Sequence, residues 1–156
     1  MAGQQFVATQ SMCTGITIQK HSGTSVTNTA TVSIQTLSAG LPTGTILGSG
    51  TITAAVWNAL VDLGEIRVNF NCILKPGTQY AIVLSVSPTT GTSNEWRTTY
   101  IGTTPPYTSG LMLLRVTNWA TYATGDLYFK THYGPQTAST RTTASARSAA
   151  SARSAA

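Results

Sequence analysis

The sequence predicts an all-β fold: an antiparallel two-sheet sandwich, jelly-roll-like, with an extended C-terminal arm. Three observations support this prediction. Apolar and polar residues alternate with a period of two over several short runs, as they do in half-buried strands. Gly and Pro separate these runs at short intervals, as turns require. Charged residues make up only 8% of the chain, and Thr, Ser and Gly take their place, which suits pleated surfaces and turns.

The clearest predicted strand covers residues 65–72. Its apolar face is formed by Ile66, Val68, Phe70 and Cys72, and its polar face by Arg67, Asn69 and Asn71. Residues 80–86 are apolar on both faces, which is typical of a central strand. The other predicted strands are residues 5–9, 15–20, 31–37, 45–53, 95–101, 111–116 and 126–131.

Turn residues mark the ends of several strands. Leu41-Pro42-Thr43-Gly44 and Lys75-Pro76-Gly77-Thr78 both carry Pro and Gly at positions that turns favour. The only candidate helix covers residues 54–63, and the alternative for this segment is a loop around a buried Trp57. About eight or nine short strands at this spacing predict the two-sheet sandwich.

The chain divides into a β-sandwich domain, residues 1–134, and a Ser/Ala/Arg low-complexity C-terminal arm, residues 135–156. The arm lacks large apolar residues, so it cannot bury enough surface to fold alone. It carries Arg141, Arg147 and Arg153 and no acidic residue. Three arginines without interleaved aromatic residues are too sparse for a nucleic-acid footprint, so we do not expect nucleic acid as a partner.

No catalytic motif, metal site or cofactor site is predicted. His21 and His132 are the two candidate general bases near neutral pH, and neither lies in a recognised catalytic motif. The spacing of His, Cys, Asp and Glu matches no common metal-ligand pattern. Cys13 and Cys72 are the only cysteines. Cys72 continues the apolar face of its strand, which favours a buried free thiol, and a Cys13–Cys72 disulfide is the alternative.

The N-terminal residues Met1 to Gln10 include neither a basic region nor an apolar run, so we expect no signal peptide. No apolar run approaches the length of a membrane-spanning helix, so no membrane partner is expected. These observations predict a protein that is made in the cytoplasm without a signal peptide, so any export must use another route.

Three turn-centred motifs carry a resemblance to a known family. They are Leu41-Pro42-Thr43-Gly44-Thr45-Ile46-Leu47, residues 74–84 (LKPGTQYAIVL) and residues 125–131 (GDLYFKT). The chain resembles a β-sandwich module that recurs in bacterial surface proteins and in structural proteins of tailed phages. With its basic arm it resembles the cement (decoration) proteins of tailed-phage capsids. The resemblance implies a non-enzymatic virion protein on the capsid exterior, whose arm binds the major capsid protein.

The arm would use its arginines in this role. Arg147 and Arg153 are an even number of residues apart, so an extended arm presents both on one face. Each guanidinium can make a bidentate contact with a carboxylate of the partner, and an extended arm can add a strand to a partner's sheet. A surface poor in charge and attachment at several points both favour a homo-oligomer, a dimer or a trimer.

The alternative function is carbohydrate binding on a phage tail or a bacterial surface. Trp96, Tyr100, Tyr107 and Trp119 fall in loops or weak strands of the second half of the chain. Exposed aromatic rings at such positions can stack on sugar rings. The other interpretation is that Trp96 and Trp119 cap the ends of the hydrophobic core.

Overall fold

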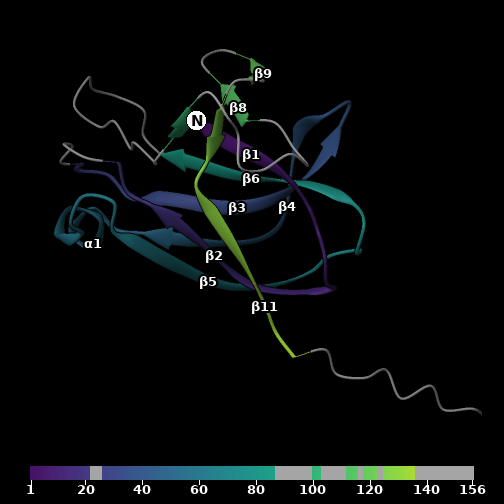
Figure 1. The fold of residues 1–156 in the computed structure, drawn as a ribbon, viewed down its shortest axis with the longest axis horizontal. Coiled ribbons are helices and arrows are strands. Elements are labelled where there is room, and N and C mark those ends of the chain that lie inside the picture. Colours follow the sequence, from purple (N-terminus) through teal and green to yellow (C-terminus); the bar gives the residue numbers. More distant parts are fainter. Residues whose placement is uncertain (22–25, 87–99, 103–111, 116–117, 123–124, 136–156) are drawn as a thin grey trace, which may run out of the picture.

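The computed structural model describes residues 1–21, 26–86, 100–102, 112–115, 118–122 and 125–135. Short strands dominate this part of the chain (Figure 1). In chain order the elements are β1 (Ala2–Val7), β2 (Met12–Gln19), β3 (Ala30–Ser38), β4 (Leu41–Ile52), α1 (Ala54–Ala59), β5 (Glu65–Ile73), β6 (Gln79–Val86), β7 (Tyr100–Gly102), β8 (Met112–Arg115), β9 (Trp119–Tyr122), β10 (Gly125–Leu127) and β11 (Phe129–Tyr133).

Two antiparallel sheets pack face to face, so the predicted sandwich is confirmed. The larger sheet has the strand order β4-β3-β6-β1-β8-β9, and the smaller has the order β11-β2-β5. A short pair, β10 with β7, accompanies them. In Figure 1, β11 is the edge strand of the smaller sheet that lies in front of β2 and β5, and it leads to the point where the described chain ends.

The core lies between the two sheets, where the inward faces of their strands meet. Its largest buried side chains include Phe6 of β1, Ile16 of β2 and Ile34 of β3. The predicted alternation in β5 is confirmed, because Val68 and Cys72 are buried, Ile66 and Phe70 pack partly buried against the core, and the polar residues between them are exposed. Strand β6 is buried on both faces as predicted, and the outward face carries Ala81 and Val83 in a second, smaller apolar cluster.

The turn predicted at residues 41–44 is wrong. These residues belong to β4, and the chain turns at Ala39 and Gly40, which both have positive φ (49° and 78°). Two consecutive positive φ values are typical of the tight two-residue turn whose twist matches that of a hairpin. Pro42 is tolerated in β4 because β4 is an edge strand, where a missing N–H need not break the ladder.

The single strand predicted over residues 126–131 is also wrong. The chain forms two strands there, interrupted at Tyr128. Strand β10 pairs with β7, whereas β11 pairs with β2. The alternating pattern continues across the break, so the sequence shows no sign that the two halves have different partners.

The predicted turn at residues 75–78 is confirmed. Thr78 N–H donates to the Lys75 carbonyl at 3.1 Å, and Gly77 has a φ of 78°. Glycine reaches this conformation without steric cost, which explains the Pro-Gly pair between β5 and β6.

The candidate helix over residues 54–63 is present in a shorter form, as α1. Thr53 caps it, its Oγ1 accepting from the Val56 N–H at 3.4 Å. Trp57 is fully buried in the main core. Lys20 Nζ donates to the Leu60 carbonyl at 2.8 Å, which attaches the end of the helix to the smaller sheet. The helix interpretation of this segment is therefore confirmed over a shorter range, and the buried Trp57 of the loop alternative lies in the helix.

Candidate functional site

The structure describes only part of the predicted binding residues. Arg141, Arg147 and Arg153 of the arm lie outside the described residues, as do Trp96 and Tyr107. Tyr100 begins strand β7, and only its backbone is described. Trp119 is described fully: it begins β9 and is half-buried.

Trp119 lines a cavity of about 350 Å³ on the outward face of the larger sheet, which we call the outer groove. We define the outer groove by six lining residues: Gln35, Thr43, Val83, Ser85, Asn118 and Trp119. They come from strands β3, β4, β6 and β9 and from the residue that precedes β9. These strands are not all neighbours in the sheet, so the groove depends on the shape of the whole sheet.

Curvature of the larger sheet creates the groove. Strands β4 and β9 are its opposite edges, yet the two strands contact each other. The sheet therefore curls toward its outward face, with Val83 and Ser85 of β6 between the two edges. Trp119 packs on one side against the cluster of Ala81, Val83 and Leu113. This packing holds the indole beside the groove that it lines.

Hydrogen bonds fix the opposite wall of the groove. Gln35 Oε1 accepts from the Gly44 N–H at 3.2 Å, and Gln35 Nε2 donates to Ser33 Oγ at 3.1 Å. Thr36 and Thr43 share a hydrogen bond of 2.6 Å between their hydroxyl oxygens. The side chains that line the groove include hydroxyl and amide groups beside an aromatic ring and none that is charged, and the lining also includes Met1, the first residue of this chain. This chemistry suits a neutral ligand with several hydroxyl groups.

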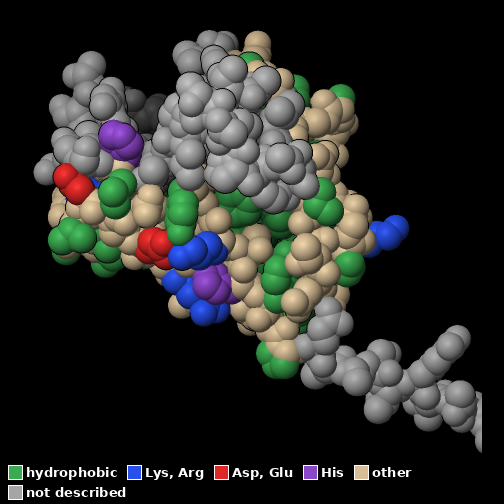
Figure 2. Space-filling view, in the orientation of Figure 1, with side chains coloured by type: hydrophobic (Ala, Val, Ile, Leu, Met, Phe, Trp, Pro, Cys, Tyr) green, Lys and Arg blue, Asp and Glu red, His purple; other side chains and the backbone are tan. Residues whose placement is uncertain are grey.

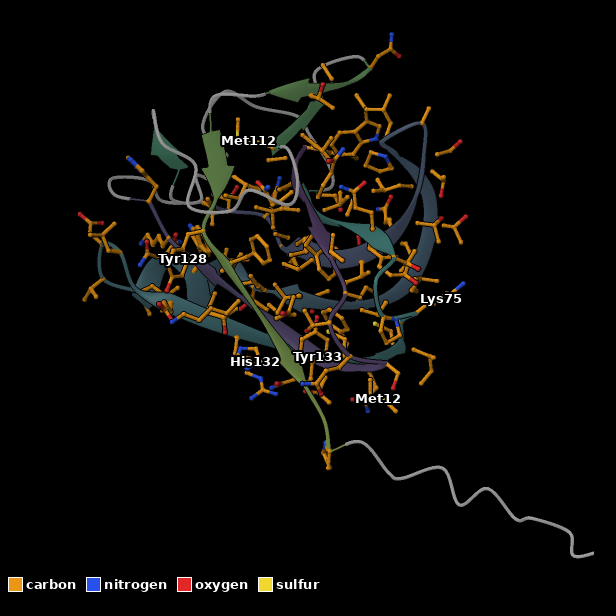
Figure 3. All side chains as sticks on the ribbon, turned by 45° about the vertical axis from the view of Figure 1, so that its right-hand side comes forward. Met12, Lys75, Met112, Tyr128, His132 and Tyr133 are labelled. Carbon is orange, nitrogen blue, oxygen red and sulfur yellow. The ribbon has the colours of Figure 1, made fainter. Side chains whose placement is uncertain are left out.

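The second candidate site is the place where the arm leaves the sandwich, which we call the arm root: β11 with the two residues that follow it. Strand β11 pairs with β2 over five residue pairs. Beyond the ladder, Thr9 N–H donates to the Tyr133 hydroxyl at 3.2 Å, and Gly134 N–H donates to the Met12 carbonyl at 3.1 Å. Figure 3 shows Met12 and Tyr133 together at the end of β11. The arm therefore begins from backbone that is hydrogen-bonded up to Gly134.

Charged side chains tie the start of β11 to β5. Lys130 Nζ lies 2.8 Å from both carboxylate oxygens of Glu65, and the Tyr128 hydroxyl donates to Glu65 at 2.6 Å. The hydrogen bond from Lys130, followed by that from Tyr128, holds the pKa of Glu65 below its ordinary value. Figure 2 shows acidic, basic and histidine side chains grouped on this face of the molecule. The contacts cross over β2, so all three strands of the smaller sheet are joined.

His132 belongs to the same face and contacts the neighbouring strand β2. Its Nε2 lies 2.7 Å from the Thr17 hydroxyl oxygen of β2. Burial, followed by the nearby positive charges of Arg67 and Lys130, lowers the pKa of His132 below 6.5. A histidine that is neutral near pH 7 and bonded to a strand neighbour acts here as part of the β11–β2 contact.

Cys13 and Cys72 are both free and buried, which agrees with the favoured interpretation. They also lie directly opposite each other in the β2–β5 ladder. Hydrogen bonding from Cys72 is the main reason why the pKa of Cys13 falls to about 7, and the same contact raises the pKa of Cys72. Local patterns do not indicate that β2 and β5 are neighbours, so the sequence left the pairing of the two cysteines only as an alternative.

Within the described ranges, no group of three or more His, Cys, Asp or Glu side chains is placed to hold a metal ion. The helix in the described part of the chain is too short to cross a membrane. No sequence pattern predicted that Gln35, Thr43, Ser85 and Asn118 line the outer groove. Polar residues on strands are typical of any exposed sheet face, and only the curvature of the sheet brings these four together.

Comparison with known proteins returned no matching family model, no matching curated protein and no matching solved structure.

Proposed function

We propose that this chain is a non-enzymatic virion structural protein: a capsid cement protein that binds the major capsid protein through residues 135–156. The observation that supports the proposal best is the arm root. A binding arm is useful only if a pull on it reaches the folded domain, and here the arm continues directly from a strand that is bonded to the sandwich up to Gly134.

The direction of the strand pairing matters for this role. Strand β11 lies antiparallel to β2, so a pull on the arm along the strand loads the interstrand hydrogen bonds in shear. Bonds loaded in shear must break together, whereas bonds pulled sideways break one by one. The Lys130–Glu65 ion pair adds a second link, between β11 and β5. The smaller sheet therefore acts as the anchor of the arm.

The proposed contact with the capsid uses backbone and charge. An extended arm can add hydrogen bonds to a sheet edge of the partner, and its arginines can pair with partner carboxylates. Arms from two or three copies would bind neighbouring capsid subunits at once, so the affinity of the oligomer would exceed that of one arm. The sandwich would remain on the capsid exterior and resist separation of the subunits.

Truncation of the arm tests this proposal. We expect a chain that ends at Gly134 to lose binding to purified capsids in a sedimentation assay, and to keep the thermal unfolding midpoint of the full chain. A variant with Arg141, Arg147 and Arg153 changed to Ala should bind at least tenfold more weakly. The matched variant with three Lys keeps the charge but loses bidentate geometry, and should fall between the two. Capsid binding by the truncated chain equal to that of the full chain would contradict the proposal.

The outer groove favours a second candidate function, the binding of a neutral saccharide. Trp119 offers the aromatic platform, and Gln35, Thr43 and Asn118 offer amide and hydroxyl groups around it. The three side chains can donate and accept hydrogen bonds, as sugar hydroxyls require.

Titration with neutral oligosaccharides tests the second function. We expect Trp119→Ala to lose binding, whereas Trp119→Phe, which keeps an aromatic face, should retain part of it. Asn118→Ala should weaken binding without loss of fold. The chain truncated at Gly134 is the cross-control, since it should bind the saccharide normally. Equal affinity of Trp119→Ala and the unmodified chain would exclude the groove as the binding site.

A further inference from the structure

The two cysteines of the chain face each other across one pair of strands. Cys13 of β2 and Cys72 of β5 are direct partners in the antiparallel register. Residues paired in this way have Cα atoms about 4.5 or 5.5 Å apart, depending on the type of pair. Both distances fall within the range of roughly 4.4–6.8 Å that disulfides span. The backbone therefore already has the spacing that a disulfide requires.

An irregularity beside the pair gives the strands room to adjust. Between the Cys13–Cys72 pair and the Gly15–Asn69 pair, β2 contributes one residue and β5 contributes two. This is the pattern of a β-bulge, which interrupts the ladder and lets a strand bend locally. Opposite Cβ atoms in a regular ladder lie slightly farther apart than those of a disulfide, so a nearby bulge makes closure easier.

Both thiols are enclosed. Cys13 is 0% exposed and Cys72 is 5% exposed. Strand β4 covers Cys72 closely: a Cβ on Gly48 would lie 2.9 Å from the Cys72 Cβ. On its other side, Cys13 pairs with Tyr133 of β11. A bulky reagent cannot enter this space while the sheets are packed, so the oxidant must be small.

We propose that Cys13 and Cys72 form a redox-sensitive pair, which hydrogen peroxide converts into a disulfide that joins β2 to β5. This inference is independent of the proposed function, because it rests on the paired cysteines alone.

The reaction needs two steps. The Cys13 thiolate attacks one oxygen of hydrogen peroxide, the O–O bond breaks, and the second oxygen leaves as hydroxide and takes up a proton to form water. Cys13 is then a sulfenic acid. The Cys72 sulfur attacks the Cys13 sulfur, the S–O bond breaks, and the leaving hydroxide takes the Cys72 proton to form a second water. In total, two thiols lose two electrons and two protons, and one peroxide is reduced to two waters.

The hydrogen bond between the thiols assigns the roles. Hydrogen bonding from Cys72 is the largest cause that lowers the pKa of Cys13 to about 7, so Cys13 is the more acidic thiol of the pair. The pKa of Cys72 is raised, so Cys72 keeps its proton. Cys13 is thus the nucleophile in the first step, and Cys72 is the resolving thiol already in position for the second.

The disulfide would strengthen the anchor of the arm. Met12, adjacent to Cys13, accepts the hydrogen bond from Gly134 at the arm root. A covalent bond between β2 and β5 at this end would hold β2 in place, and β2 is the strand to which β11 is hydrogen-bonded. It also closes a long loop in the unfolded chain, which lowers the entropy of the unfolded state.

The test treats the full chain with hydrogen peroxide under native conditions, removes the peroxide, and then unfolds the chain in denaturant with an alkylating reagent that blocks the remaining thiols. Peptides are then mapped by mass spectrometry without reduction. We expect one intramolecular cross-link between the Cys13 and Cys72 peptides and no alkylated thiol. The thermal unfolding midpoint should rise by roughly 5–15 °C and return to its starting value with dithiothreitol.

Two single variants separate the roles of the cysteines. In Cys72→Ala, Cys13 should accumulate as a sulfenic acid, which dimedone traps when the chain is unfolded in its presence. In Cys13→Ala, Cys72 should react with peroxide at least tenfold more slowly than Cys13 does. Circular dichroism would check that each variant is folded. The cross-link in the unmodified chain is a separate test that does not require either variant. Any of three results would overturn the proposal: sulfinic acids on both cysteines without a cross-link, a cross-link between chains only, or oxidised methionines beside unreacted thiols.

Discussion

Cys13 shows how a single contact sets the chemistry of a buried side chain. Burial alone would raise the pKa of this thiol, but the hydrogen bond from Cys72 has the larger effect in the opposite direction. Backbone hydrogen bonds at Gly15 and His132 and the charge of Arg67 add to it. The net result is an acidic thiol inside an apolar core, where a cysteine is ordinarily inert.

The titration of Cys13 is therefore a sharp residue-level prediction. The ultraviolet absorbance of the thiolate should rise with a midpoint at about pH 7 in the folded chain. Changing Cys72 to Ala removes the largest cause of the shift, so the midpoint should move up toward or beyond 8.5, the ordinary value for cysteine. An unchanged midpoint in Cys72→Ala would show that the thiol pair does not set the pKa.

At the level of the element, the packing of β4 and of β11 depends on a few particular residues. Strand β4 lies over β5 through two glycines, Gly48 and Gly50. A Cβ on Gly50 would lie 2.5 Å from Val68 Cγ1 and 3.1 Å from the Asn69 carbonyl oxygen. Neither neighbour can retreat easily, because Val68 is buried in the core and Asn69 belongs to the ladder with β2.

Gly50→Ala should thus destabilise the sandwich by about 1–3 kcal/mol, the usual cost of overpacking a core. Ser49→Ala is the matched control, since Ser49 is exposed on the same strand and should change stability by less than about 0.5 kcal/mol. Urea denaturation measures both. Equal stabilities of the two variants would mean that β4 and β5 are less closely packed than the structure shows.

Strand β11 should hold less firmly in acid. The pKa of His132 is lowered in the folded state, mainly by burial and then by the charges of Arg67 and Lys130, while Glu65 opposes the shift. A lowered pKa means that the unfolded chain binds the proton more readily. The contribution of His132 to stability is therefore fully present above pH 6.5 and is lost as the pH falls through the folded pKa.

Replacing His132 by Gln should reduce this pH dependence. Gln can still hydrogen-bond to the Thr17 hydroxyl, but it does not titrate. Between pH 7.5 and pH 5, the unmodified chain should lose more stability in urea denaturation than His132→Gln loses. The comparison of slopes removes the shared contribution of other groups, including Glu65 and Cys13. Parallel curves for the two chains would contradict the role given to His132.

For the whole molecule, the boundary between the sandwich and the arm decides what a truncation should remove. Gly134 is the residue up to which backbone hydrogen bonds to the sandwich are seen in the described chain. A chain that ends there keeps the β11 ladder, the Tyr133 contact and the whole core. The arm has no large apolar side chains with which to stabilise the domain.

Truncation after Gly134 should leave the unfolding midpoint within about 2 °C of that of the full chain. Truncation after Lys130 is the contrasting variant, because it removes three of the five residues of β11 together with the Tyr133 and Gly134 hydrogen bonds. It should lower the unfolding midpoint by more than the first truncation does. Differential scanning calorimetry measures both. A large loss of stability in the first truncation would place part of the arm in the folded domain.

Oligomeric state is the second prediction at this scale. Analytical ultracentrifugation of the full chain should give the mass of a dimer or a trimer, as multivalent attachment to a capsid favours. A monomer at all accessible concentrations would remove the avidity argument from the proposed function.

The sequence by itself determined the elements: the alternation in β5, the two-sided apolar character of β6 and the Pro-Gly turn after residue 75 are local patterns, and the backbone follows them. The turn predicted at residues 41–44 and the unbroken strand predicted across Tyr128 were wrong. At both places the pairing partners of the strands, and not the local pattern, determine where a strand begins and ends. Only the tertiary structure brought Cys13 opposite Cys72 and curled Gln35, Asn118 and Trp119 around one groove. These juxtapositions depend on which distant strands pair and how the sheet twists, and period-two patterns are identical for every possible partner.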